Sequence, residues 1–272
     1  MEVTVATVCM DSGTDVTKNI KYASDSVISA ASQGADWILL PETFSHMGPR
    51  ANHIKSAFHD EDPRIIEFKM LSKKLGVTIF LGTVPERVKD SDKIFNTLYV
   101  IDKSGEIIAK YRKTHLFSLN GLKPEDSYQE KNTYIAGDQL KTLKIDGFQV
   151  HLSICYDIRF SAMFNKLQAK SQCDVIVCPS AFAMSTGKRH WHILMQSRAI
   201  EYQCYVVAAA QTGLKSDSRS NYGHALICDP MGKIIEDTGS TPGIIISKLS
   251  KSHLKKTRQT LPVLKDLRHD LY

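Results

Sequence analysis

Hydrophobic positions along the chain alternate between helical and extended spacing. Helical spacing predicts an amphipathic helix over residues 15–32, whose apolar stripe is Val16, Ile20, Ala23, Val27 and Ala31. Similar stripes predict helices over residues 64–76 and 188–204. Between the first two helices, ADWILLPE (35–42) predicts a strand buried on both faces, because the run is continuously apolar up to Pro41.

The later strands are predicted to pair partly as hairpins. Turn signals at residues 102–105, 146–147 and 229–232 interrupt the segments FNTLYVIDKSGEIIAKYRK, TLKIDGFQVHLSICYD and HALICDPMGKIIED. Single strands are predicted at the N-terminus and at TIFLGTVP, CDVIVCPSAF and YVVAAAQTG. The sequence shows no repeat, low-complexity tract or linker. We therefore expect one α/β domain over residues 1–272, with a mixed sheet.

Composition narrows the class of protein. The 272 residues are 42% hydrophobic and 24% charged, as in ordinary globular proteins, and no apolar run has the length of a membrane helix. The net charge of +6 comes from scattered basic residues, which argues against a nucleic-acid partner. The first strand lacks the basic region of a secretory signal, and the six cysteines include no CxxC pair. These features favour a reduced, cytoplasmic protein with no membrane partner.

Three reactive side chains follow predicted strands. Glu42 comes after WILLP, Lys113 after IIAKYR, and Cys155 after FQVHLSI. Ligands of α/β folds bind at strand ends, and these groups suit acyl transfer. The thiol would be the nucleophile, the carboxylate its base, and the ammonium group the partner of the oxyanion. Spacing alone leaves an ordinary role open for each residue. Glu42 could be a loop or cap residue, Lys113 an edge-strand lysine, and Cys155 a buried packing residue.

Other catalytic arrangements find less support. In a Cys–His hydrolase, Cys155 would pair with His115 or His151, but His151 lies on the same strand, roughly 13 Å away. His115 stays possible as the histidine partner of Cys155. A metal site at His190 and His192 is disfavoured, because residues two apart on a helix point in different directions. The sequence contains no G-x-S-x-G motif of a serine hydrolase.

Three blocks of the sequence resemble the signature motifs of the nitrilase superfamily, the carbon–nitrogen hydrolases. They are LPETF (40–44), KYRKTHLF (110–117) and SICYDIRF (153–160), and their order and separation also match. The similarity extends from the first strand to the C-terminal LPVLKDLRHDLY. It implies an α-β-β-α sandwich and a reaction that needs neither a metal nor a cofactor.

The resemblance also implies catalytic roles for individual residues. Glu42 matches the general base, Lys113 the catalytic lysine, and Cys155 the nucleophile. The motif YQEK resembles the F-x-E block of the family, which makes Glu130 the second glutamate. Glu125 matches this position less well.

Within the superfamily, CPSAFAMSTG and RAIEYQCYVVAAAQTG look most like the branch that hydrolyses deaminated glutathione. This implies an amidase that forms a cysteine thioester and releases ammonia. An ω-amidase acting on α-ketoglutaramate and a catalytically idle binding protein are the alternatives. The resemblance places Phe182, Thr186 and His190 in the substrate pocket, although ordinary loop or helix positions stay open for them. The backbone N–H of Tyr156 would complete the oxyanion site with Lys113.

The sequence departs from its relatives at two places. RFSAM, with Ser161 and Ala162, stands where RFPEL is usual, and RHWH, with Arg189 and His192, replaces AHWE. Because a cation forms strong hydrogen bonds to carboxylates, we expect Arg189 to favour a longer, dianionic substrate. The expected partners are a small anionic amide and further copies of the chain. The resemblance implies a homodimer or higher homo-oligomer that pairs through the helices near the cysteine.

Overall fold

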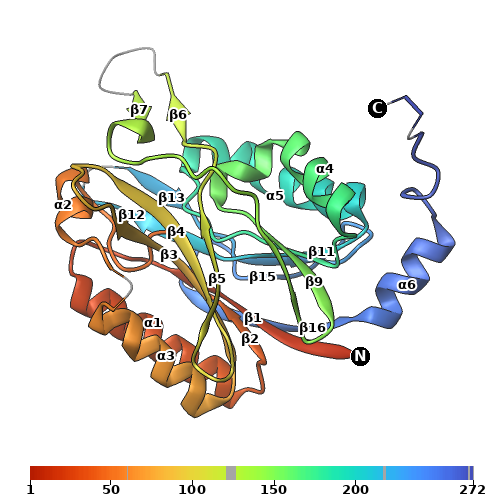
Figure 1. The fold of residues 1–272 in the computed structure, drawn as a ribbon, viewed down its shortest axis with the longest axis horizontal. Coiled ribbons are helices and arrows are strands. Elements are labelled where there is room, and N and C mark those ends of the chain that lie inside the picture. Colours follow the sequence, from red (N-terminus) through yellow and green to blue (C-terminus); the bar gives the residue numbers. More distant parts are fainter. Residues whose placement is uncertain (60, 121–126, 217–218, 269, 272) are drawn as a thin grey trace.

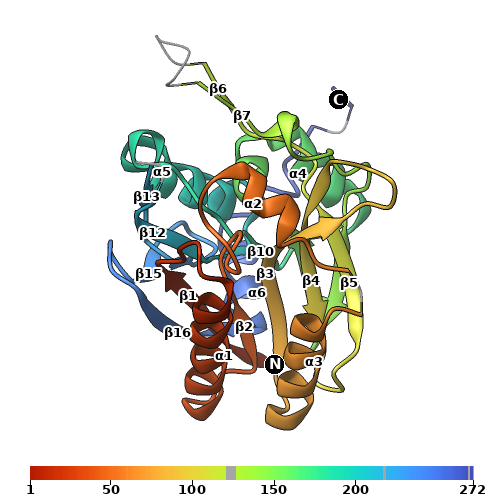
Figure 2. The ribbon, with the colours of Figure 1, turned by 90° about the vertical axis from the view of Figure 1, so that its left-hand side faces the viewer.

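The computed structural model describes residues 1–59, 61–120, 127–216, 219–268 and 270–271. Two β-sheets lie face to face between two pairs of helices (Figures 1 and 2). The first sheet is covered by α1 (Val16–Ser32) and α3 (Pro63–Leu75), and the second by α4 (Ser161–Lys170) and α5 (Met184–Tyr202). The expected α-β-β-α sandwich is therefore confirmed.

The first sheet has the strand order β13-β12-β1-β2-β3-β4-β5, and β16 also pairs with β1. Its strands are β1 (Glu2–Met10), β2 (Trp37–Leu39), β3 (Thr78–Arg87), β4 (Ile94–Ile101), β5 (Ile107–Arg112), β12 (Ala210–Leu214), β13 (Ser220–Tyr222) and β16 (Gly243–Ser250). Parallel pairing of β1 with β2 and antiparallel pairing of β3 with β4 make it a mixed sheet, as expected.

The second sheet has the order β15-β14-β11-β10-β9-β8. Its strands are β8 (Thr142–Ile145), β9 (Phe148–Leu152), β10 (Val175–Val177), β11 (Tyr205–Ala208), β14 (Leu226–Cys228) and β15 (Ile234–Asp237). The smaller elements are β6 (Ser118–Leu119), β7 (Tyr128–Gln129), α2 (Arg50–Lys55), α6 (Lys251–Thr260) and the 3₁₀ turns η2 (Glu130–Asn132) and η3 (Cys155–Arg159). The β6–β7 hairpin projects from the sandwich (Figure 1).

The side chains of β1 contribute to two separate hydrophobic cores. Val3 and Val5 pack with residues of the second sheet, whereas Ala6 and Val8 pack with α1 and α3. Successive side chains of a strand point to opposite faces, so a strand between two apolar layers must be apolar at nearly every position. This explains why the strand-forming runs of the sequence are continuous rather than alternating.

Predicted helices and hairpins are present, with one shifted boundary. α1 begins after Asp15, whose side chain accepts a hydrogen bond from the Lys18 N–H at 3.1 Å. The three predicted hairpins are β4–β5, β8–β9 and β14–β15. α5 begins at Met184 rather than at residue 188, so it includes Gly187. A glycine fits there because a Cβ atom would lie only 2.5 Å from the Tyr222 side chain.

The six cysteines are all buried, and each is a free thiol. Within the described part of the chain, no helix combines the length and the apolar character needed to cross a bilayer.

His151 lies on β9 in the second sheet, and its side chain is buried. Its Nε2 atom is 3.1 Å from the Ser171 carbonyl oxygen, so this nitrogen carries a proton and donates it to the carbonyl. Burial lowers the pKa of His151 to about 4, because the charged imidazolium ring would lose its hydration. The side chain is therefore neutral in the folded protein at neutral pH.

We predict that His151 makes the protein less stable in acid. As the pH falls below 6.5, the unfolded chain binds a proton that the folded chain excludes until about pH 4, so stability decreases through this window. The loss is about 3 kcal/mol. His151→Gln keeps a donor for Ser171 but does not titrate. Urea unfolding of both proteins, in neutral and in acidic buffer, measures the difference. An equal acid sensitivity would contradict a neutral His151.

Candidate active site

Glu42, Lys113, Glu130 and Cys155 converge in one cavity of about 750 Å³. Glu42 follows β2, Lys113 follows β5, Glu130 begins η2, and Cys155 begins η3 after β9. All four side chains are buried. Both sheets of the sandwich therefore supply loops to the same cavity, and residues distant in the sequence meet there.

The two carboxylates share one lysine. Lys113 Nζ lies 2.9 Å from Glu42 Oε1 and 2.9 Å from Glu130 Oε2. The Asn96 amide on β4 donates to both carboxylates, at 2.9 Å to Glu42 Oε1 and 3.3 Å to Glu130 Oε1. Asn96 was not predicted from the sequence, because an asparagine inside an apolar strand carries no motif of its own.

Backbone N–H groups also donate to each carboxylate. The Ala181 N–H donates to Glu42 Oε2 at 2.9 Å, and the Phe117 N–H donates to Glu130 Oε2 at 2.6 Å. A glycine at position 82 lets β3 approach the Glu42 turn, because a Cβ atom there would lie 2.1 Å from the Pro41 carbonyl oxygen. The carboxylates are thus fixed from several sides before any substrate binds.

Burial and charge set the protonation of the cluster. Burial alone would lower the pKa of Lys113, but Glu130 and Glu42 hold this pKa well above its usual value. Burial raises the pKa of Glu130 more than the charge of Lys113 lowers it. Burial, followed by the charge of Glu42, raises the pKa of Cys155 well above that of a free thiol. At rest the site therefore holds a charged lysine and a neutral thiol hydrogen-bonded to Glu42.

The Cys155 backbone adopts the left-handed conformation, with φ of 48°, which is uncommon for a residue other than glycine. Its N–H donates to the Pro179 carbonyl oxygen at 3.0 Å. The preceding Ile154 N–H donates to Asp157 Oδ2 at 3.0 Å. Strain of this kind persists only where neighbouring groups hold it, and it is concentrated at functional sites.

Asp157 connects the cysteine turn to the loop that carries Lys113. It is buried and accepts hydrogen bonds from the Tyr111 hydroxyl at 2.7 Å and from His115 Nδ1 at 2.7 Å. His115 thus bonds to Asp157, and it is not among the residues described as lining the cavity. With His151 bonded to Ser171 inside the second sheet, the structure provides no support for a Cys–His pair.

The remaining predicted site residues fall into two groups. Tyr156, Phe182 and Thr186 line the cavity. Arg189 and His190 are exposed and do not belong to the described lining, which corrects the expectation that they lie in the pocket. The reason is the early start of α5: its first turn borders the cavity, and the next turn continues away from it. Glu125 lies outside the described residues.

Arg159 lines the cavity but was not predicted as a site residue. Its guanidinium carbon lies 5.7 Å from the Tyr156 ring centroid and 5.0 Å from that of Phe182. Its Nη1 atom is 3.2 Å from His190 Nδ1, whereas its buried Nε has no hydrogen-bond partner among the described residues. The only signal in the sequence was its place in SICYDIRF, one helical turn after Cys155. A second arginine, Arg219, also lines the cavity and is exposed.

The sequence profile described as "Carbon-nitrogen hydrolase" matches residues 4–259, nearly the whole chain. The chain belongs to the carbon–nitrogen hydrolase family. This agrees with the resemblance to the nitrilase superfamily that the three sequence blocks indicate. The protein is therefore a hydrolase of carbon–nitrogen bonds other than peptide bonds.

Similar proteins place this carbon–nitrogen hydrolase among amidases. It is 36% identical to the deaminated glutathione amidase of a Synechocystis strain, over 94% of each chain. It is 31% identical to the Omega-amidase NIT2 of Xenopus tropicalis, over 94% of this chain and 91% of the relative. The crystal structure of the C. elegans NitFhit protein superposes with a TM-score of 0.92 at 29% identity, covering 100% of this chain and 66% of that one.

We predict that Lys113 acts mainly on the transition state. Lys113→Met removes the positive charge beside the thiol, and loss of an oxyanion partner should lower kcat by about 100-fold or more. It also leaves two carboxylates together, so a stability loss of about 3–5 kcal/mol should accompany it. Steady-state kinetics on protein shown to be folded by circular dichroism measures the effect.

Lys110 provides a matched control on β5, the strand that precedes Lys113. Its Nζ atom lies 3.6 Å from Glu86 Oε1, away from the cavity, so Lys110→Met should leave kcat unchanged. A Lys113→Met protein with normal kcat and a raised KM alone would show that Lys113 binds substrate instead.

Proposed function

We propose that this carbon–nitrogen hydrolase is a deaminated glutathione amidase that acts through a thioester on Cys155. The observation that carries the proposal is the buried cluster of Glu42, Lys113 and Glu130 around a thiol in one cavity. Relatives with this activity in their names are 32–36% identical along nearly the whole chain. The intact cluster argues against an idle binding protein.

The geometry supports proton transfer from Cys155 to Glu42 as the first step. The thiol is hydrogen-bonded to Glu42, so its proton can pass to the carboxylate while the sulfur attacks the amide carbonyl carbon. The resulting oxyanion would be stabilised by Lys113 Nζ and by the Tyr156 N–H. The Cys155 N–H is already bonded to Pro179, whereas the first N–H groups of a helical turn have no acceptor inside the turn.

Breakdown of the tetrahedral intermediate completes acylation. Glu42 returns the proton to the leaving nitrogen, the C–N bond breaks, and an acyl thioester stays on Cys155. A water molecule then attacks the thioester carbonyl carbon, with Glu42 accepting its proton. The C–S bond breaks, the carboxylic acid product leaves, and Glu42 returns the proton to the sulfur, which restores the thiol. Glu130 accepts two of the hydrogen bonds that fix Lys113 and Asn96, which supports a positioning role rather than direct proton transfer.

The substrate's chemistry defines the product that must be measured. In deaminated glutathione a keto group replaces the amino group of the γ-glutamyl residue, and the γ-carbonyl is joined to cysteinylglycine. Hydrolysis of that bond releases α-ketoglutarate and cysteinylglycine. The ammonia that we expected from the sequence would instead be released from α-ketoglutaramate. The two candidate substrates share the α-keto acid, and only the longer one carries a distal glycine carboxylate.

Two cavity arginines suit these two carboxylates. Arg159 is half-buried close to Cys155, with a buried Nε that has no partner among the described residues, and it would bind the shared α-keto acid. Arg219 is exposed at the cavity and stacks over Tyr128 at 4.9 Å, so it would bind the distal carboxylate. Arginine is suited to both because its planar guanidinium group can bind a carboxylate with two parallel hydrogen bonds.

We predict a higher kcat/KM for deaminated glutathione than for α-ketoglutaramate. Arg219→Ala should lower only the first value, by about tenfold or more, as expected for one charge-assisted hydrogen bond. Arg159→Ala should lower both. Release of cysteinylglycine and of ammonia, followed separately, measures the two reactions.

Arg189→Ala is the matched control, because this exposed arginine lies outside the described cavity lining, and it should change neither value. Cys155→Ala should abolish both reactions. A wild-type preference for α-ketoglutaramate would assign the chain to the ω-amidases. Activity of Cys155→Ala would refute the thioester mechanism itself.

We also propose a homodimer that pairs through the second helical layer. On α5, Ile193 is 65% exposed and Ile200 is 49% exposed, and these residues are two turns apart on one face. Met231, 53% exposed, lies beside the same helix. Apolar surface gathered on one helix supports burial against a second copy.

Ile193→Glu should convert the dimer to a monomer, since a charge would replace a buried contact. Multi-angle light scattering after gel filtration measures the mass of each protein. Met70→Glu is the control, because Met70 is 67% exposed on α3, in the opposite helical layer. A monomeric wild-type protein, or a dimer that survives Ile193→Glu, would contradict this interface.

The compartment that suits this chemistry is a reducing one, and we propose the cytoplasm. A thiol nucleophile must stay reduced, and all six cysteines are free. Fractionation of cells that express the protein would test this localisation.

A further inference from the structure

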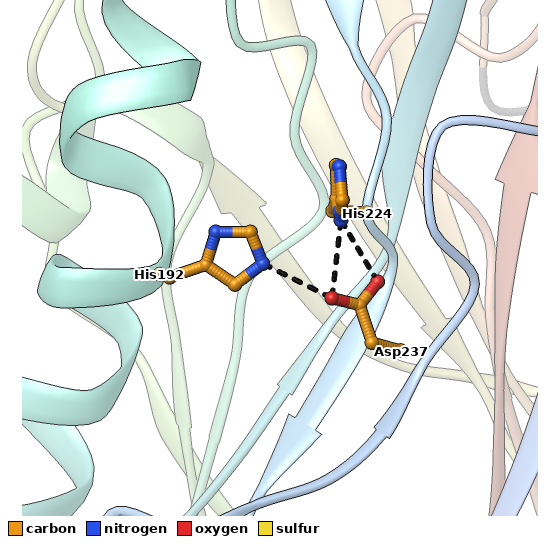
Figure 3. A group of neighbouring side chains, drawn as sticks. All are labelled: His192, His224 and Asp237. Atoms are coloured by element: carbon orange, nitrogen blue, oxygen red, sulfur yellow. Dashed lines mark hydrogen bonds and ion pairs between the residues drawn. The ribbon is translucent and has the colours of Figure 1, made fainter.

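Outside the cavity, His192, His224 and Asp237 bring three potential metal ligands together (Figure 3). His192 Nε2 lies 3.0 Å from Asp237 Oδ2, and His224 Nδ1 lies 3.1 Å from both oxygens of Asp237. One donor atom from each of the three side chains lies within 4.8 Å of the others. The two imidazole rings therefore converge on one carboxylate.

Each of the three residues is held by a different element. His192 projects from the middle of α5, Asp237 ends β15, and His224 follows β13 with a left-handed φ of 61°. The His224 N–H donates to the Gly239 carbonyl at 2.7 Å, and its carbonyl accepts from Trp191 Nε1 at 2.8 Å. The backbone around these side chains is thus fixed by contacts that do not involve them.

The donor chemistry and exposure suit a divalent transition metal. Two imidazole nitrogens and a carboxylate oxygen form a common zinc ligand set, with ligand distances of about 2.0–2.2 Å. Donor atoms around such a tetrahedral ion are separated by roughly 3.3 Å, close to the separations of both histidine nitrogens from Asp237. The three side chains are 22–27% exposed, so water can reach a fourth coordination position.

We propose that His192, His224 and Asp237 form a binding site for one divalent transition metal ion, best matched by Zn²⁺. The ion would replace the protons through which the histidines now bond to Asp237. It would tie α5 to the β14–β15 hairpin beside the Trp191 ring, which packs against the cavity residue Phe182 at 4.8 Å between centroids. This role is separate from the catalytic cluster and does not depend on the proposed substrate.

Zinc binding to the full-length protein tests the site. The background is Cys155→Ala, because the catalytic thiol could itself bind zinc. Isothermal titration with ZnCl₂ should give one ion per chain, and ZnCl₂ should raise the melting temperature. Asp237→Asn keeps the side-chain shape and the oxygen that accepts the Gly239 N–H. It should weaken zinc binding by about 100-fold or more, because even groups that only orient metal ligands contribute about 10–100-fold to metal affinity. His192→Ala should have the same effect.

His253→Ala is the matched control. His253 Nε2 lies 3.7 Å from Asp229 Oδ2, and no third ligand joins this pair in the described part of the chain. Its loss should leave zinc affinity unchanged. Absence of zinc binding by the Cys155→Ala protein would overturn the proposal. So would undiminished binding by Asp237→Asn and His192→Ala, because the ion would then bind elsewhere.

Discussion

The buried ammonium group of Lys113 is the interaction on which the active site depends. Two carboxylates of like charge cannot both stay ionised in a buried cavity unless a cation lies between them. Lys113 supplies that cation at 2.9 Å from each carboxylate, and its own charge is stable there only because both are present. Burial and the neighbouring Glu42 raise the pKa of Glu130, and the charge of Lys113 in turn lowers it. Beside Glu42, the raised pKa of the Cys155 thiol keeps it neutral at rest.

The catalytic cluster combines residues from both sheets of the sandwich. Glu42, Lys113 and Asn96 belong to the first sheet and its loops, whereas Cys155 follows a strand of the second. Asp157 joins the two by accepting from Tyr111 on β5 while holding the cysteine turn. A displacement of one sheet relative to the other would separate nucleophile from base, so packing between the sheets is also a catalytic requirement.

Sequence patterns predicted the parts of the protein that local physics determines. Apolar spacing located helices and strands, and strand ends located Glu42, Lys113 and Cys155. The placement of Arg189 was wrong because it depended on the phase of α5, and the helix includes a Ser-Thr-Gly segment that has low helical propensity. Arg159 and the His192–His224–Asp237 group were missed for another reason. Their significance comes from neighbours on other elements, and spacing along one segment cannot show such contacts.

Residues on different faces of α5 contact different parts of the protein. Successive residues on a helix are turned by about 100°, so neighbours in the sequence face different surroundings. Thr186 borders the cavity, Trp191 is buried against Phe182, His192 faces Asp237, and Ile193 is exposed. Because the helix is rigid, a contact made by one face constrains the others. A metal ion at His192 or a partner at Ile193 would therefore act on the cavity wall through the position of the helix itself, without touching the catalytic residues.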